Sequence, residues 1–239
     1  MSTSKIPSPL FSIVTATFNS SSTILDTAKS LQNYPRNLVE WIIIDGQSTD
    51  NTIEILKSNP FRIPDRITCE PDQGIYDAMN KGVEKSSGSF IIMLNSDDYF
   101  VDNILFEIQK IIQTNPGYKI YAGGLHLISN SATKQMFPHG RFPTSMPAFQ
   151  PSSFISRELL QKNSFSEKFK IASDFLWFKE RQLEGCPIYY VPKVITNFRT
   201  NGASNNTMMR LAEMKLALQH TMKSKMWAFF WYLILRMRT

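Results

Sequence analysis

Apolar runs alternate with helical patterns through the first hundred residues, and few folds accommodate that order. Each run ends in a polar turn, and a segment with helical spacing follows it. The expected strands are 10–17, 39–45, 66–70 and 90–94, and the expected helices are 23–33, 51–58 and 75–86. Such alternation is typical of a mostly parallel sheet covered by helices, so the sequence predicts an α/β fold.

Polar residues follow all four expected strands, and right-handed crossovers place them along one edge of the sheet. They are Asn19, Asp45, Asp72, Asp97 and Asp98. Open α/β sheets bind their ligands at this edge. The adjacent carboxylates of Asp97 and Asp98 repel each other, and a divalent cation that also holds a phosphate would relieve the repulsion. The alternative is that both acids cap a helix over 102–114.

Composition limits the classes of ligand. The chain has 239 residues, which leaves room for one large domain or two small ones, and its apolar fraction of 42% is enough for a real core. Its net charge of +6 favours anionic partners such as phosphates or acidic lipid headgroups. Nucleic acid is not expected, because the positive charge is spread out and the sheet edge is acidic. No glycine-rich phosphate loop is present, so phosphates would be held by a metal and by side chains.

The sequence after residue 100 is more irregular. Short strands are expected at 118–122, 125–129 and 134–137, then a loop over 138–151, helices at 157–162 and 173–183, and paired strands at 188–191 and 194–199. Asp174 lies in the first turn of an aromatic-rich helix. Aromatic surroundings raise a carboxyl pKa and a helix N-terminus stabilises the anion, so Asp174 is a candidate general base or an ordinary first-turn acid.

The two ends of the chain differ from its centre. Residues 1–9 are polar, lack a signal core and are expected to be disordered. Residues 208–239 form an amphipathic helical tail whose aromatic segment, 225–238, is flanked by basic residues and is shorter than the ~20 residues that span a bilayer. Such a tail fits a helix on an anionic membrane surface; the alternative is docking on the core or on a second copy in a homodimer. Cys69 and Cys186 form no disulfide or metal pattern, which fits the cytoplasm.

Four segments, in order, resemble motifs of the family 2 glycosyltransferases, which have the GT-A fold. They are 11–19, 44–52, 70–82 and 94–98, and the third is similar to the branch that builds bacterial surface polysaccharides of the colanic-acid type. The resemblance implies a Rossmann-type sheet with a nucleotide-sugar-binding half over 10–100. An acceptor-side half over 101–207 and amphipathic C-terminal helices over 208–239 would follow.

The same resemblance implies roles for the residues of the donor site. Asp45 would hydrogen-bond the nucleobase, and Asp72 would lie near the base or ribose. Other residues of the pocket would be Thr15, Thr17, Asn19, Asn95 and Ser96. Asp97 would coordinate Mn²⁺ or Mg²⁺ on the diphosphate, with Asp98 beside it. Asn95 occupies the first position of the family's D-x-D motif, which leaves Asp97 as the main protein ligand.

Residues 171–174 resemble the family's second acidic motif, whose aspartate is the general base in inverting members. This favours Asp174 as the catalytic base. The sequence therefore predicts a metal-dependent, inverting, hexosyltransferase-type enzyme that moves a sugar from a UDP- or GDP-sugar to a saccharide or lipid-linked saccharide. It would act in cell-surface polysaccharide synthesis as a peripheral protein at the inner face of the plasma membrane.

Two other functions fit parts of the sequence. A nucleotidyltransferase that makes a nucleotide-sugar would share the metal and the α/β sheet, but it usually has a glycine-rich start with Arg and Lys, which this chain lacks. A non-catalytic binding or assembly protein on the same fold is compatible with Asn95 in the metal motif. That protein would keep its function when Asp174 is replaced by asparagine.

Overall fold

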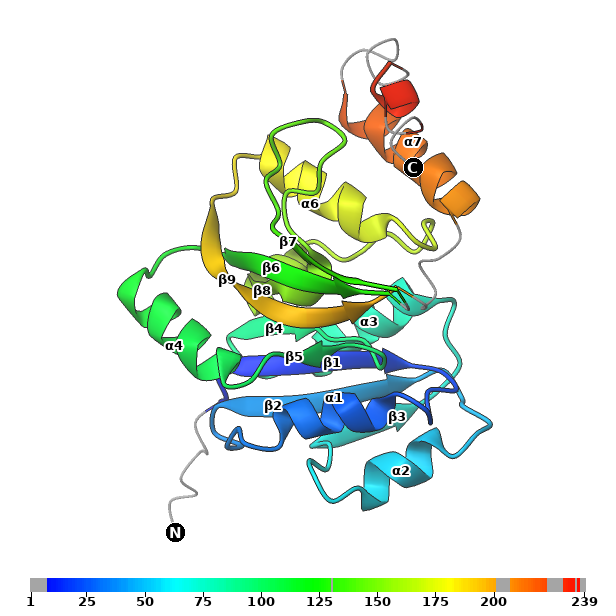
Figure 1. Ribbon diagram of the computed structural model, residues 1–239, viewed down its shortest axis with the longest axis vertical. Coiled ribbons are helices and arrows are strands. Elements are labelled where there is room, and N and C mark those ends of the chain that lie inside the picture. Colours follow the sequence, from blue (N-terminus) through cyan, green and yellow to red (C-terminus); the bar gives the residue numbers. More distant parts are fainter. Residues whose placement is uncertain (1–7, 130, 201–206, 223–229, 235, 237–239) are drawn as a thin grey trace.

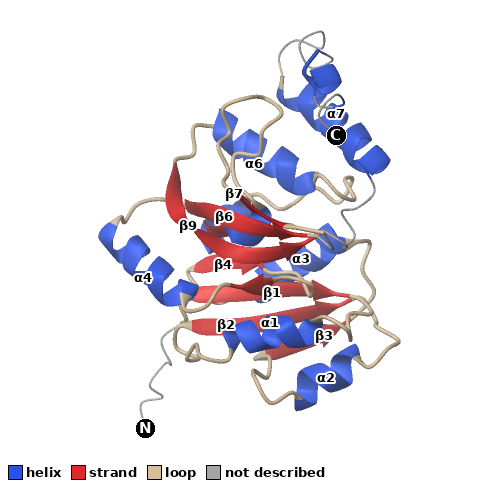
Figure 2. Ribbon diagram, in the orientation of Figure 1, coloured by secondary structure: helices blue, strands red, loops and turns tan. Residues whose placement is uncertain are grey.

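The computed structural model describes residues 8–129, 131–200, 207–222, 230–234 and 236, and it contains one mixed sheet (Figure 1). Eight of its nine strands follow the order β3-β2-β1-β4-β8-β6-β9-β5, and the ninth, β7, pairs with β6 off this path. Helices pack on both faces of the sheet (Figure 2). The predicted α/β fold is confirmed. The disorder expected at 1–9 falls mainly on residues 1–7, which lie outside the described part of the chain.

The first half of the chain forms the parallel part of the sheet. Its strands are β1 (Phe11–Thr17), β2 (Val39–Asp45), β3 (Arg66–Cys69) and β4 (Phe90–Met93), and its helices are α1 (Ile24–Leu31), α2 (Thr52–Ser58) and α3 (Ile75–Lys85). Thr17 at the end of β1 pairs with Asp45 at the end of β2, and Val14 pairs with Met93 at the end of β4. The turns after β1, β2 and β4 therefore lie at one edge, as predicted.

The second half adds mostly antiparallel pairs beyond β4. Its elements are β5 (Tyr99–Phe100), α4 (Ile104–Thr114), β6 (Ile120–Ile128), β7 (Thr133–Met136), η1 (Gln150–Ser152), β8 (Ser153–Ser156), α5 (Arg157–Lys162), α6 (Ser173–Leu183), β9 (Ile188–Arg199) and α7 (Thr207–Thr221). Strand β8 runs antiparallel between β4 and β6, whereas β9 is parallel to β6. Strands β5 and β8 are not among those that the sequence predicts.

Two predicted breaks in the strands are wrong. The strands expected at 118–122 and 125–129 form one strand, β6, and those expected at 188–191 and 194–199 form one strand, β9. The β6–β9 register is irregular around Gly123, where an added Cβ would lie 2.7 Å from the Lys193 carbonyl oxygen. Pro192 lies in the same irregular stretch, where it need not donate a ladder hydrogen bond. Glycine and proline thus meet in one bulge instead of ending two strands.

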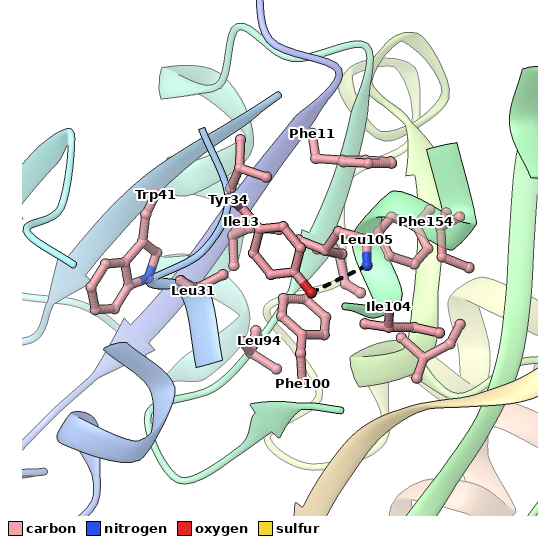
Figure 3. Close-up of a cluster of buried hydrophobic side chains, with 14 of the residues drawn as sticks. Phe11, Ile13, Leu31, Tyr34, Trp41, Leu94, Phe100, Ile104, Leu105 and Phe154 are labelled. Carbon is pink, nitrogen blue, oxygen red and sulfur yellow. Dashed lines mark hydrogen bonds between the residues drawn. The ribbon is translucent and has the colours of Figure 1, made fainter. Parts of the chain in front are cut away.

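Side chains of β1 alternate between two core layers. Phe11 and Ile13 pack in the layer that α1 and α4 cover (Figure 3). In that layer the Tyr34 hydroxyl accepts a hydrogen bond of 3.4 Å from the Leu105 amide. Val14 packs in the opposite layer, which α3, α5 and α6 cover. Burial of apolar surface contributes about 25 cal/mol per Å², so these two layers stabilise the sheet whose edge carries the polar turns.

Helix α7 packs against α6, at one end of the molecule in Figures 1 and 2. Its Ala217 and Leu218 are buried against Phe175 and Leu176 of α6. Residues 230–234 and 236 are also helical, while 223–229, 235 and 237–239 of the predicted tail lie outside the described residues. Across the residues that the structure describes, we find no helix with the length and apolarity needed to cross a membrane.

Candidate active site at the carboxyl edge of the sheet

Asp45 occupies the carboxyl end of β2 and is fixed by the turn that follows it. Its side chain is only 1% exposed, and its two carboxylate oxygens accept hydrogen bonds from the Ser48 amide (2.9 Å) and the Ser48 hydroxyl (2.5 Å). The turn after β1 joins this one, because the Asn19 amide donates to the Ser48 hydroxyl and the Asn19 side chain accepts from the Thr49 amide, both at 2.8 Å. The two turns form one rigid wall of the site.

Asp72 reaches the same wall from the turn before α3. A Cβ added at Gly46 would lie 2.5 Å from Asp72 Oδ2, so the carboxylate rests directly against the Gly46 backbone. The other carboxylate oxygen accepts a hydrogen bond of 2.9 Å from the Gly74 amide. Phe18 lies beside them with 60% of its surface exposed, and its ring would be 3.6 Å from the same Gly46 Cβ. The predicted meeting of Asp45 and Asp72 therefore occurs, and an exposed aromatic ring accompanies it.

Thr15 and Thr17 contribute differently from the prediction. Thr15 has no exposed surface, and its hydroxyl accepts a hydrogen bond of 3.0 Å from the Trp41 indole. Its side chain belongs to the core, so its assignment to the nucleotide pocket is corrected. Thr17 lies opposite Asp45, and its buried hydroxyl has no hydrogen-bond partner among the described residues. Of the two threonines, only Thr17 offers a polar atom at the edge.

The turn after β4 carries the acidic motif and is tied to the turn after β1. The Ser96 hydroxyl lies 2.7 Å from the Ser20 hydroxyl, and the Thr27 hydroxyl of α1 donates to the Asp98 carbonyl oxygen at 2.7 Å. Helix α4 begins only at Ile104, with Asn103 as its N-cap. The alternative that Asp97 and Asp98 cap this helix is therefore wrong.

Asp97 and Asp98 occupy unlike environments. Asp97 is partly exposed, and burial raises the pKa of its carboxyl group. Asp98 has no exposed surface, and burial followed by repulsion from Asp97 raises its pKa well above the usual range. Arg199, at the end of β9, donates its amide to Asp98 (3.2 Å) and its guanidinium to the Asp97 carbonyl oxygen (2.9 Å) and to Asp26 of α1 (2.5 Å). Asp97 is thus the carboxylate that faces outward, and Asp98 lies behind it.

The donor atoms of this turn fit a divalent cation that arrives with oxygen ligands of its own. Asn95 Oδ1 and Asp98 Oδ2 are buried without a hydrogen-bond partner among the described residues, next to the accessible Asp97 carboxylate. Within the described ranges, no three His, Cys, Asp or Glu side chains cluster closely enough to hold a metal on their own. Mg²⁺ is commonly bound by one or two carboxylates together with substrate phosphates, and this turn matches that arrangement.

Asp174 lies in the first turn of α6 and contacts α3, the helix that follows the Asp72 turn. The Tyr76 hydroxyl of α3 is shared between the Ile171 carbonyl oxygen (2.7 Å) and Asp174 Oδ1 (3.0 Å). Burial raises the pKa of Asp174, whereas hydrogen bonds from the Phe175 amide and from Tyr76 lower it. A carboxylate whose pKa is raised is a stronger proton acceptor than an ordinary aspartate.

Two residues that hold Asp174 escape the sequence analysis. Tyr76 follows the Asp72–Gly74 turn by two residues, and an aromatic hydroxyl in the first turn of a helix is a weak local signal. Glu213 of α7 accepts hydrogen bonds from the backbone amides of residues 170–172. The signal for Glu213 is its spacing, because it shares the buried face of α7 with Ala217, one turn later.

Comparisons with known proteins find similar sequences and structures. The model of glycosyl transferase family 2 matches residues 12–179, more than two thirds of the chain. A PGL/p-HBAD biosynthesis glycosyltransferase from Mycobacterium tuberculosis is 32% identical over 117 residues, which are 47% of this chain and 46% of that protein. The match thus spans about half the length of that relative. A GalNAc(5)-diNAcBac-PP-undecaprenol beta-1,3-glucosyltransferase from Campylobacter jejuni is 25% identical over 222 residues, which are 83% of this chain and 69% of that protein.

Solved structures share the fold. Staphylococcus aureus TarS 1–349 in complex with UDP-GlcNAc matches with a TM-score of 0.69 and 18% identity, covering 91% of this chain and 69% of that one. The mannosyltransferase PcManGT from Pyrobaculum calidifontis, in complex with GDP-Man and Mn²⁺, matches with a TM-score of 0.69 and 15% identity. That match covers 91% of this chain and 65% of PcManGT. Both likenesses concern the fold of the chain.

Proposed function

The chain belongs to glycosyl transferase family 2, and we propose that it moves a sugar from a nucleoside-diphosphate sugar to an acceptor hydroxyl. One observation carries the proposal. Asp45 and Asp72 line one side of the carboxyl edge, Asp97 lies in the neighbouring turn, and Tyr76 connects the donor side to Asp174. The acidic groups gathered at this edge match what a nucleotide, a cation and a reacting hydroxyl need.

The donor nucleotide would bind between the turns after β1, β2 and β3. Asp45 and Asp72 would accept hydrogen bonds from the N–H and O–H groups of a base and ribose, and Thr17 would supply a hydroxyl. The exposed ring of Phe18 is placed to stack on the base, because aromatic faces bind bases through their π-systems. UDP- and GDP-sugars are both candidates, since the uracil and guanine edges each present an N–H donor.

Asp97 would hold Mn²⁺ or Mg²⁺, with Asn95 and Asp98 contributing the buried oxygens beside it. When bound, such a cation would offset the negative charge that develops on the departing nucleoside diphosphate. Arg199 would keep the turn in place through its bonds to Asp26 and to the Asp97 carbonyl oxygen. Asn19 and Ser96 would support the two turns through backbone and hydroxyl contacts instead of touching the base.

Asp174 would act as the general base in a single displacement. The acceptor oxygen forms a bond to the anomeric carbon as the bond from that carbon to the diphosphate oxygen breaks. The acceptor proton passes to Asp174, and the nucleoside diphosphate leaves with the bonding electron pair. One displacement inverts the configuration at the anomeric carbon, so the proposal is that of an inverting enzyme.

The acceptor is proposed to be a saccharide, in the first instance one linked to a membrane lipid. The name of the Campylobacter relative includes an undecaprenyl-linked saccharide, and the aromatic end of this chain would bring the site to such a lipid. Trp231 and Tyr232 pack on the α6–α7 cluster, while Phe230 and Leu233 are exposed beside them. Peripheral binding at the inner face of the plasma membrane would follow. The protein should therefore co-sediment with anionic vesicles. If the tail instead mediates a homodimer, the protein should show twice the monomer mass in the absence of vesicles.

The reaction product distinguishes the proposal from its rivals. Incubation with UDP- and GDP-sugars, Mn²⁺ and a panel of saccharide acceptors should release a nucleoside diphosphate that depends on the acceptor. The Asp174→Asn variant should lose this release while it keeps nucleotide binding. Pyrophosphate release would favour a nucleotidyltransferase, and full function of Asp174→Asn would favour a binding or assembly protein.

A further inference from the structure

The turn that carries Asp174 is held from outside by a buried carboxylate on α7. Glu213 is 9% exposed, and it accepts three hydrogen bonds from consecutive backbone amides. The amide of Lys170 donates to Oε1 at 2.7 Å, and the amides of Ile171 and Ala172 donate to Oε2 at 2.8 and 2.9 Å. Forty-one residues separate Glu213 from Ala172, so folding alone brings them together.

The backbone amides of residues 170–172 find their hydrogen-bond acceptor outside their own turn. Ala172 is the N-cap residue of α6, so its own amide is among those that have no acceptor within the helix. Amides at a helix N-terminus are partly positive, and a carboxylate is the most favourable partner for them. Hydrogen bonds to a charged acceptor are also about twice as strong as neutral ones. Glu213 therefore supplies a charged acceptor for the amide of the N-cap residue Ala172 and for the two amides before it, which lead into α6.

Groups on α3 hold the opposite side of the same turn. The Tyr76 hydroxyl contacts the Ile171 carbonyl oxygen and Asp174, and the Lys170 ammonium donates to the Gln73 carbonyl oxygen at 2.6 Å. Gln73 lies in the turn next to Asp72, on the donor side of the site. Residues 170–174 are thus fixed between the donor side and α7, and removing either side leaves the position of Asp174 less defined.

We propose that Glu213 is a positioning residue that holds the Asp174 carboxylate in place for the transfer reaction. This inference rests on the proposed function, in which Asp174 is the base. It makes α7 part of the active site instead of an appendage that leads to the C-terminus. Packing of Ala217 and Leu218 against α6 brings Glu213 to its position, so the docking of α7 and the geometry of the base are one arrangement. The negative charge of Glu213 also raises the pKa of Asp174, after the larger effect of burial.

The test compares Glu213→Gln with a control on the same pair of helices. His220 of α7 lies 3.3 Å from Glu180 of α6, away from residues 170–174, and His220→Ala removes this polar contact between α7 and α6. We measure kcat for nucleoside diphosphate release, the Kd for the nucleoside diphosphate and the midpoint of thermal unfolding. Glu213→Gln should lower kcat roughly 10- to 100-fold, as expected for a misplaced catalytic group, with Kd within about twofold of wild type. His220→Ala should keep kcat within about twofold.

Three results would overturn the inference. Glu213→Gln could turn over at the wild-type rate while Asp174→Asn is inactive, which leaves the proposed function intact. Glu213→Gln and His220→Ala could lose kcat equally, which indicates a purely structural role of α7. An active Asp174→Asn variant would show that Asp174 is not the base and would refute the proposed mechanism.

Should Glu213→Gln fail to fold, hydrogen exchange on the wild-type protein tests the contact between Glu213 and residues 170–172 instead. Slow exchange of the amides of residues 170–172 supports the contact, and exchange as fast as in exposed loops overturns it.

Discussion

Replacing Gly46 with alanine should weaken nucleotide binding without unfolding the protein. The backbone of Gly46 does not adopt a positive φ, so alanine fits its conformation. The new Cβ would lie 2.5 Å from Asp72 Oδ2, and ordinary contact begins at 3.4 Å, so the carboxylate must move by about 1 Å. Because the displaced atom is the end of a side chain, the free energy of unfolding should change by less than about 1 kcal/mol.

The size of the binding defect follows from the hydrogen bonds of Asp72. A carboxylate that shifts by this distance while it keeps its 2.9 Å bond to the Gly74 amide loses its bond to the ligand. A hydrogen bond to a charged group contributes about 1.5–3 kcal/mol, so the Kd for the nucleotide should rise roughly 10- to 150-fold. Isothermal titration calorimetry with UDP and GDP measures Kd directly, and urea unfolding measures stability on the same samples.

A double-mutant cycle isolates the cause. If Gly46→Ala acts by displacing Asp72, it should have no further effect on Kd in the Asp72→Ala background. Additive effects of the two substitutions, or a Gly46→Ala variant that binds nucleotide as the wild type does, would refute the reasoning. In that case the contact between Gly46 and Asp72 would have no role in the donor site.

Three further predictions concern groups around the site. The acid limb of the kcat–pH profile should lie above the usual aspartate range, because burial raises the pKa of Asp174. In the wild type the hydrogen bond from Tyr76 lowers this pKa, so Tyr76→Phe should raise it and move the acid limb to higher pH. A shift of the limb to lower pH would contradict this. Burial lowers the pKa of Lys179 from 10.5 to about 8. Its positive charge therefore destabilises the folded protein by up to about 3 kcal/mol below pH 8, and this destabilisation disappears as the pH rises from about 8 to 10.5. Denaturation of wild type and Lys179→Met should therefore reveal a stability difference that shifts in favour of the wild type between about pH 8 and pH 10.5, whereas a constant difference would argue against it. Thr27→Val should cost about 1–3 kcal/mol of stability in urea unfolding, because it removes the hydroxyl that donates to the buried Asp98 carbonyl oxygen; an unchanged midpoint would contradict this.

Local chemistry made much of the fold and part of the site predictable. Strand β2 and helices α5 and α6 have the predicted bounds, because an apolar run or a helical pattern stops at a clear turn or cap in each case. Parallel topology then brings Asp45 and the turn after β4 to one edge without any knowledge of their contacts. Patterns with a local cause were therefore sufficient for the architecture.

Features that depend on distant partners could not be predicted in the same way. Strand β5 has two residues and exists because it pairs with β9, and β8 follows a proline-rich loop and exists because β4 and β6 flank it. Glu213 accepts hydrogen bonds from amides more than forty residues earlier in the chain, so its spacing places it on the buried face of α7 without revealing this partner. Thr15 is different, since it lies two residues before the end of β1, a strand that is buried on both faces, whereas Thr17 is the last residue of the strand.

The central claim is that Asp97 and a divalent cation hold the diphosphate of a nucleotide whose base lies at Asp45 and Asp72. Isothermal titration of UDP and GDP into wild-type protein and Asp97→Asn, with Mn²⁺ and with EDTA, tests this most directly. We predict that at least one of the two nucleotides binds the wild type at least about tenfold more tightly with Mn²⁺, and that Asp97→Asn abolishes this difference. Equal affinity in Mn²⁺ and EDTA, or an unchanged metal dependence in Asp97→Asn, would contradict the account.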